Sequence, residues 1–163
     1  MGSECLRLCH VMQPLRRFPP ALYADALESW TFLDLADKRP LFTSPFGDVF
    51  LQTESGFWFL DVIAGDLTRL WSSEGDLIEV LNSREGQAEY LMVGLADQAE
   101  NAGLQPGEAE IYGFCIPPVL GGPTELSNVE LGDFVVTLNI AGQIHNQVRT
   151  LPPGTPISGI SLA

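Results

Sequence analysis

The sequence predicts a single α+β domain in which an antiparallel sheet, made of a three-stranded meander plus a later strand, packs against several helices. Short β-rich runs separated by glycine turns follow one another between residues 41 and 71, and apolar residues recur at helical spacing between residues 82 and 103. The chain of 163 residues can bury one core, because a domain of about 150 residues buries about two-thirds of its unfolded surface. We expect residues 1–18 to form an irregular N-terminal arm and residues 19–163 to form the domain.

The composition is that of a globular protein, with 45% hydrophobic and 18% charged residues. Eight basic and 21 acidic residues give a formal net charge of −13. Nucleic-acid phosphates repel such a surface, so we expect no nucleic-acid partner. The uncharged runs 111–124 and 134–148 are shorter than the roughly 20 apolar residues that a membrane-spanning helix needs, so we expect no membrane association.

The cysteines indicate a reducing compartment. Their number is odd (Cys5, Cys9 and Cys115), and the N-terminus has no secretory signal pattern, so we expect a cytoplasmic protein with free thiols. Cys5, Cys9 and His10 are three soft ligands within six residues, but a closed zinc site normally uses four. We therefore expect no metal and no cofactor.

The first predicted helix opens at Pro19 and Pro20, because proline suits the first turn of a helix, and we expect it to end near Asp34. Three strands follow at residues 49–53, 57–63 and 67–71, with glycine in both turns. The aromatic residues of this region are interpreted as core and cross-strand pairs, with a ligand-binding platform as the alternative. They are Phe46, Phe50, Phe57, Trp58, Phe59 and Trp71.

Ser73 and Asp76 form a capping pair for a short helix, and a longer helix begins with Asn82 as its cap and continues to Gly103. A buried strand is predicted at residues 110–116, because the prolines that follow cannot continue a central ladder. Residues 131–149 fit both an alternating strand pattern and a helical stripe. We favour the helix, since the segment is longer than an ordinary strand.

Acidic residues dominate the second half of the chain. Between Glu85 and Val148 there are nine acidic residues and no lysine or arginine. A one-signed field can steer a basic partner, although it can also serve only solubility. The predicted partner-binding residues are Glu85, Glu89, Asp97, Glu100, Glu108 and Glu110.

An alternative site is a pocket for a small molecule or for a cryptic enzyme activity, in which His145 pairs with a carboxylate as an acid–base unit. Its residues would be Phe46, Asp48, Asp61, Gln143 and His145. The competing interpretation of His145 is a polar side chain satisfied by a backbone carbonyl. No phosphate loop, dinucleotide-binding fingerprint, nucleophile elbow or zinc-protease motif occurs, so we expect no catalytic residues. A third possible role is that of an oligomerisation module.

Several ordered motifs together resemble one family, the C-terminal domain of type VI secretion immunity proteins, which is often found behind a GAD-like domain. The resemblance covers about residues 41–155. The motifs are Ser44–Phe50, Phe59–Asp61, Leu67–Trp71, Tyr112–Phe114 leading into Pro117–Gly122, Asn128–Glu130 and Asn139–His145. The stretch before Leu41 is shorter than a complete GAD-like domain.

The resemblance implies a cytoplasmic α+β domain without catalytic activity. Relatives in this family bind and block a cognate toxin, which is a DNase in the best-known case. An acidic inhibitor suits such a toxin, because proteins that bind DNA tend to be basic. The resemblance therefore implies a protein that occludes a basic, nuclease-like toxin.

Overall fold

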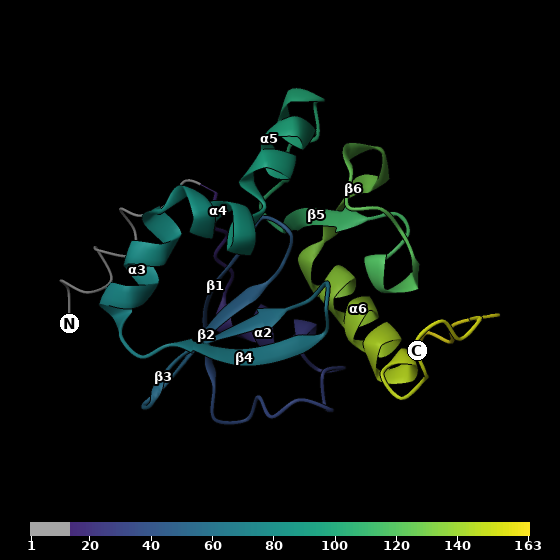
Figure 1. The fold of residues 1–163 in the computed structure, drawn as a ribbon, viewed down its shortest axis with the longest axis horizontal. Helices are drawn as coiled ribbons and strands as arrows, with labels where there is room; N and C mark the ends of the chain where they lie inside the picture. Colours follow the sequence, from purple (N-terminus) through teal and green to yellow (C-terminus); the bar gives the residue numbers. More distant parts are fainter. Residues whose placement is uncertain (1–13) are drawn as a thin grey trace.

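The computed structural model describes residues 14–163, and its central feature is a four-stranded antiparallel sheet (Figure 1). The strands follow chain order, each paired with the next. They are β1 (Arg39–Thr43), β2 (Val49–Thr53), β3 (Gly56–Asp61) and β4 (Asp66–Trp71). The α+β class and the three predicted strands are thus confirmed.

The composition of the sheet differs from the prediction in two respects. β1 adds a fourth strand at the edge, where Pro40 is tolerated because an edge strand needs fewer backbone donors. The later strand, β5 (Glu110–Phe114), does not join this sheet. It pairs antiparallel with β6 (Val129–Asp133) in a separate two-stranded sheet, which we call the β5–β6 ribbon.

Helices cover both faces of the main sheet, because the strands alternate their side chains. Val49, Leu51 and Leu60 belong to the core shared with α2 (Pro20–Ala26) and α6 (Phe134–Val148). Phe50 and Phe59 point to the other face and pack with residues of α3 (Glu74–Asn82) and α4 (Arg84–Leu91). The predicted core role of the aromatic residues is confirmed: five of the six are buried and Trp58 is half-buried.

A third, smaller core joins α5 (Val93–Asn101) to the β5–β6 ribbon. Its buried members are Phe46, Ala96, Ala99, Tyr112 and Val129. Two short 3₁₀ turns, η1 (Pro118–Leu120) and η2 (Leu126–Asn128), lie between the two strands of the ribbon. The ribbon therefore docks beside the main sheet through a core of its own.

The N-terminal caps form largely as predicted. The Ser73 hydroxyl accepts a hydrogen bond from the Asp76 amide at 3.1 Å at the start of α3. Ser83, not Asn82, caps α4, with its hydroxyl oxygen 2.9 Å from the Gly86 amide. At α6 the Asp133 carboxylate accepts from the Val136 amide at 3.0 Å. The helical interpretation of residues 131–149 is confirmed for Phe134–Val148, and residues 131–133 end β6.

Two predicted helices are shorter in the structure. The helix expected over residues 82–103 is divided into α4 and α5 by Met92, which has φ 49° and ψ 42°. The apolar spacing persists across this single left-handed residue, so periodicity alone missed the break. α2 ends at Ala26, well before Asp34. After α2 the chain continues in isolated turns, in which the amides of Trp30 and Leu33 donate to the carbonyls three residues earlier. Both side chains still reach the core, although no continuous helix connects them to α2.

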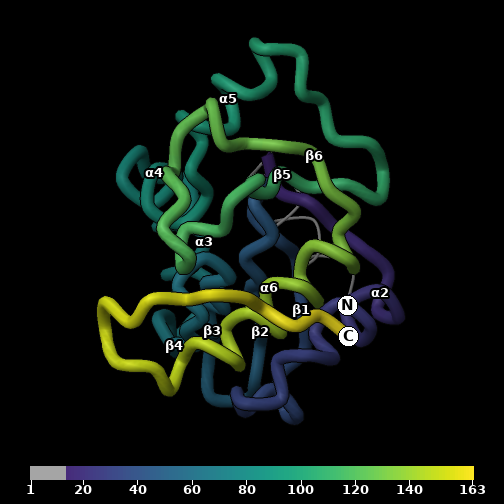
Figure 2. Tube along the Cα trace, turned by 90° about the vertical axis from the view of Figure 1, so that its right-hand side faces the viewer, coloured from purple at the N-terminus to yellow at the C-terminus, as the bar shows by residue number. Residues whose placement is uncertain are grey.

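No helix within residues 14–163 combines the length and the apolar character that crossing a bilayer requires. The C-terminal segment after α6 has no regular secondary structure and doubles back along that helix (Figure 2).

Candidate functional site

Four of the predicted partner-binding residues lie on two consecutive helices and are exposed to solvent: Glu85 and Glu89 on α4, and Asp97 and Glu100 on α5 (Figure 1). Within residues 14–163 the ion pairs join Lys38 to Asp34 and to Asp37, and none involves the predicted acidic residues. We call these four residues the acidic helical surface.

The other two predicted residues have local roles. Glu110 is half-buried, and its carboxylate accepts a hydrogen bond from the Gly107 amide at 2.8 Å, which closes the loop before β5. Glu108 is exposed, but the Arg16 guanidinium donates to its backbone carbonyl and to that of Gly107. Arg16 thus places a positive charge beside this loop, and Arg84 places one at the start of α4.

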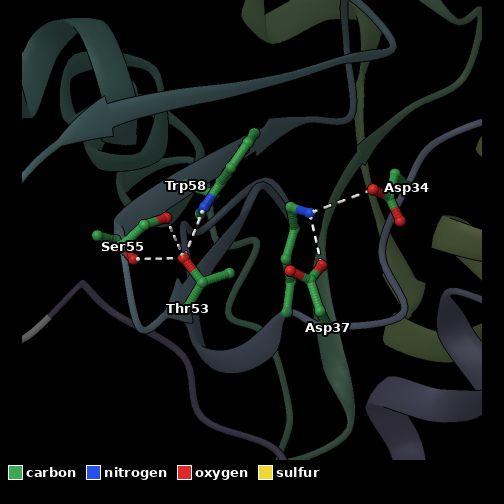
Figure 3. A network of polar contacts seen from close by, with 7 residues as sticks. Asp34, Asp37, Thr53, Ser55 and Trp58 are labelled. Carbon is green, nitrogen blue, oxygen red and sulfur yellow. Dashed lines mark hydrogen bonds and ion pairs between the residues drawn. The ribbon is translucent and has the colours of Figure 1, made fainter.

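The charge of one basic residue outside this region, Lys38, is neutralised by neighbouring aspartates. Lys38 is buried, with its ammonium nitrogen 2.8 Å from Asp37, 3.9 Å from Asp34 and 4.3 Å from the centre of the Trp58 ring (Figure 3). Ion pairing and the cation–π contact together satisfy this charge. Lys38 therefore does little to offset the acidic helical surface.

Asp48 lies buried in the loop between β1 and β2. Its Oδ2 accepts a hydrogen bond from the Ser44 hydroxyl at 2.8 Å, and its Oδ1 accepts one from the Val62 amide at 2.9 Å. The Ser44 hydroxyl oxygen in turn accepts from the amides of Phe46 and Asp48. Burial, aided by the negative charge of Asp61, raises the pKa of Asp48 to about 7.

His145 is also buried, and its ring packs against Trp30 and Gly65. Its Nε2 lies 2.9 Å from the carbonyl oxygen of Val62. A carbonyl only accepts hydrogen bonds, so Nε2 carries the proton and donates. The interpretation of His145 as a side chain satisfied by the backbone is confirmed. Its hydrogen bond goes to the Val62 backbone, and no hydrogen bond joins it to Asp48 or Asp61.

The structure brings only two of the five predicted pocket residues together. Phe46 and His145 line a common pocket, but Asp48 is enclosed in its own loop. Asp61 caps a turn by accepting from the amides of Ile63 and Ala64 at 2.9 and 2.8 Å. Gln143 faces the C-terminal segment instead of the pocket residues.

The pocket that does form lies between the β5–β6 ribbon, the η1 turn and α6, and we call it the ribbon pocket. Its volume is about 150 Å³. Most of it was missed because its walls come from segments distant in the sequence; the signal that could have revealed it was the pair of glycines, Gly113 and Gly132, in two short strands. The lining residues are Phe46, Val62, Ile63, Gly113, Phe114, Pro117, Pro118, Val119, Glu130, Gly132, Thr137, Ile140, Ala141, Ile144 and His145.

A second feature of α6 is its contact with the C-terminal segment. The side-chain amide of Gln147 accepts from the Ser161 amide at 3.1 Å and donates to the Ser161 carbonyl at 2.6 Å. Gln143, one turn earlier, makes the same pair of bonds to Ala163, at 2.6 and 3.5 Å. Two glutamine amides thus bind alternate residues of an extended backbone, as a neighbouring strand would.

No group of three or more metal-binding side chains occurs among residues 14–163. Cys5, Cys9 and His10 lie outside the described residues. Cys115 is exposed and free, with its Sγ 3.5 Å from Oε2 of Glu130.

The fold and the acidic helical surface together define a small acidic α+β domain. Residues 73–145 match the family described as T6SS immunity protein Tdi1, C-terminal. The match runs from the N-cap of α3 to His145, within the range of the predicted resemblance, and confirms the predicted family.

A solved structure shares the fold: the crystal structure of Atu4351 from Agrobacterium tumefaciens, with a TM-score of 0.57 and 18% sequence identity. The similarity covers 96% of this chain and 88% of the other. At this identity the likeness concerns the fold alone. A search of curated proteins found no match.

Proposed function

We propose that this protein is a cytoplasmic immunity protein that binds a cognate protein toxin of a type VI secretion system and occludes it without catalysis. The observation that carries the proposal is the family match over residues 73–145. That segment contains both helices of the acidic helical surface and every residue of α3 and β5.

The charge distribution indicates the chemistry of the partner. Glu85, Glu89, Asp97 and Glu100 are exposed, and none is neutralised by an ion pair among residues 14–163. Opposite charge on a partner would accelerate encounter, because complementary potentials steer association. We propose that the toxin is basic and nuclease-like. These carboxylates would then bind the surface of the toxin that otherwise binds the phosphates of nucleic acid.

The test is co-expression with the toxin encoded beside the gene for this protein. We expect the protein to protect cells from that toxin and to form a stable complex with it in size-exclusion chromatography. A variant that neutralises the acidic helical surface should protect less. Its four substitutions are Glu85→Gln, Glu89→Gln, Asp97→Asn and Glu100→Gln.

A matched control removes the same charge elsewhere. Its four exposed acids lie on α2, just after α2, in the turn between β2 and β3, and at the start of β4, and changing them should leave protection intact. The control substitutions are Asp25→Asn, Glu28→Gln, Glu54→Gln and Asp66→Asn. Absence of any complex with the wild-type protein would contradict the proposed function. Equal loss in both variants would contradict the role assigned to α4 and α5.

A second candidate function, small-molecule binding, is favoured by the ribbon pocket beside His145. The geometry gives less support to a cryptic enzyme, because His145 donates to a backbone carbonyl, and Asp48 is enclosed by Ser44 and Val62. The second candidate is therefore a binding function that uses Phe46 and His145 as wall residues.

A further inference from the structure

The ribbon pocket has the size of one aromatic ring. Its volume of about 150 Å³ equals that of engineered apolar cavities of about 150 Å³ that bind benzene. The side chains of Phe46, Val62, Ile140 and Ile144 supply apolar wall surface. An apolar group of this size would gain dispersion contacts that the empty pocket lacks.

The shape of the pocket is set by packed elements. Gly113 and Gly132 lie on the neighbouring strands of the ribbon and both face Thr137 of α6. A side chain at Gly132 would place its Cβ 2.4 Å from Oγ1 of Thr137, and one at Gly113 would place it 3.4 Å from Cγ2. The absence of side chains at these two positions allows α6 to approach the ribbon and leaves the space above them open.

The charge at the pocket has one sign. Among the lining residues, Glu130 is the only acidic one, and none is lysine or arginine. Glu130 is exposed, its nearest described partner is the weakly donating Cys115 thiol, and it forms no ion pair in the described part of the chain. A ligand with a positive charge beside its ring would find a carboxylate there, whereas an anion would be repelled.

His145 is the buried polar side chain of the pocket, and its Nε2 already has a hydrogen-bond partner within the protein. Nε2 of His145 donates to the Val62 carbonyl, and the ring packs beside Trp30, at an interplanar angle of 39°, and beside Gly65. The imidazole therefore forms part of the wall. The charge preference of the pocket then rests on Glu130.

We infer that the ribbon pocket binds a small organic amine whose apolar part is about one aromatic ring, with the ring between α6 and the ribbon and the ammonium group beside Glu130. The inference rests on the second candidate function, small-molecule binding, and is independent of toxin binding. It adds the class of ligand, a cationic aromatic or similarly sized branched amine, and the residue that selects its charge.

The test is a titration of the full chain, followed by backbone amide NMR, with three probes that share one ring: benzylamine, benzyl alcohol and benzoate. Benzylamine should give saturable shifts at Gly113, Gly132 and Ala141. It should bind at least fivefold more tightly than benzyl alcohol, and benzoate should bind most weakly. Glu130→Gln should remove most of the preference for benzylamine, while Glu125→Gln, an exposed acid outside the pocket lining, should not.

Ala141 lines the pocket from α6 and allows it to be filled. Ala141→Phe, or the smaller Ala141→Leu if the first variant loses its dispersed spectrum, should abolish benzylamine binding. Unchanged binding in a folded filled variant would overturn the site. Equal affinity for all three probes, in the wild type, would overturn the assigned charge selection but leave small-molecule binding in place. If no probe gives a saturable shift at millimolar concentration, both the charge selection and small-molecule binding are overturned. That result would leave the proposed binding of a toxin unaffected.

Discussion

Asp48 and His145 are connected through the two sides of one residue, Val62. Oδ1 of Asp48 accepts from the Val62 amide at 2.9 Å, and Nε2 of His145 donates to the Val62 carbonyl at 2.9 Å. Asp48 belongs to the loop before β2, Val62 directly follows β3, and His145 lies near the end of α6. The two side chains therefore fasten α6 and a loop to the same point of the main sheet.

Replacing His145 should destabilise the fold. His145→Ala removes a buried hydrogen bond and leaves a cavity against Trp30, so we expect a loss of about 2–4 kcal/mol in the free energy of unfolding. Urea denaturation measures it. The neighbouring Asn146 is exposed, and Asn146→Ala should change stability by less than about 0.5 kcal/mol. Equal stability of the two variants would show that His145 does not fasten the helix.

The buried carboxyl of Asp48 should make stability depend on pH. Its pKa is raised to about 7 in the folded protein, from an ordinary value of 3.8. The folded state therefore keeps a proton that the unfolded state loses above about pH 4. The contribution of Asp48 to the free energy of unfolding is largest below pH 4 and falls until about pH 7. At about 1.4 kcal/mol per pKa unit, the fall is at most about 4 kcal/mol.

Asp61→Asn tests the smaller part of this effect, because burial still raises the pKa of Asp48 but the negative charge that adds to it is removed, while asparagine keeps the oxygen that caps the turn. Denaturation from pH 4 to pH 8 should show that the decline in stability ends at lower pH in this variant and is smaller in total, because only the folded-state pKa of Asp48 is lowered. Curves of identical shape in the wild type and in Asp61→Asn would rule out the coupling between the two carboxyls.

Two helical glycines should respond in opposite directions to alanine. A Cβ at Gly86 would lie 1.9 Å from the carbonyl oxygen of Val80, so Gly86→Ala should force α3 and α4 apart and cost several kcal/mol. A Cβ at Gly94 would meet nothing within 4 Å. Gly94→Ala should therefore stabilise α5 by up to about 1 kcal/mol. Thermal unfolding tests both, and a stable Gly86→Ala variant would contradict the packing described for this turn.

The two glutamines of α6 should protect the C-terminal backbone from hydrogen exchange. Gln147 binds Ser161 and Gln143 binds Ala163, so each substitution to alanine should speed exchange mainly at its own partner. Each variant therefore serves as the control for the other. Exchange at both amides that is as fast in the wild type as in the variants would mean that the glutamines do not hold this segment in solution.

The features that the sequence could predict are local. Glycine turns and alternating residues predicted three strands of the sheet, and Ser73 with Asp76 predicted the start of α3, because each signal depends on neighbours in the chain. The break at Met92 was missed because a single left-handed residue leaves the apolar spacing unchanged. β1 was missed because Pro40 is unusual within a strand, except at a sheet edge.

The candidate sites depended on contacts between distant segments. The sequence could propose Phe46 and His145 as wall residues, but it could not show that Gln143 turns toward Ala163 or that Asp61 caps its own turn. The exposed carboxylates of α4 and α5 were easier to predict, because acidic residues on a polar helix face are usually solvated. Their role in binding remains the proposal to be tested.

The most direct test of the central claim is the rate of association with the toxin encoded beside the gene, measured by stopped flow as a function of ionic strength. We expect the rate constant to fall by at least tenfold between about 20 mM and 500 mM salt, because screening shortens the reach of the acidic helical surface. Neutralising its four carboxylates should flatten this dependence, whereas the matched control should retain most of it. An association rate that is indifferent to salt, or equally flattened in both variants, would contradict the account.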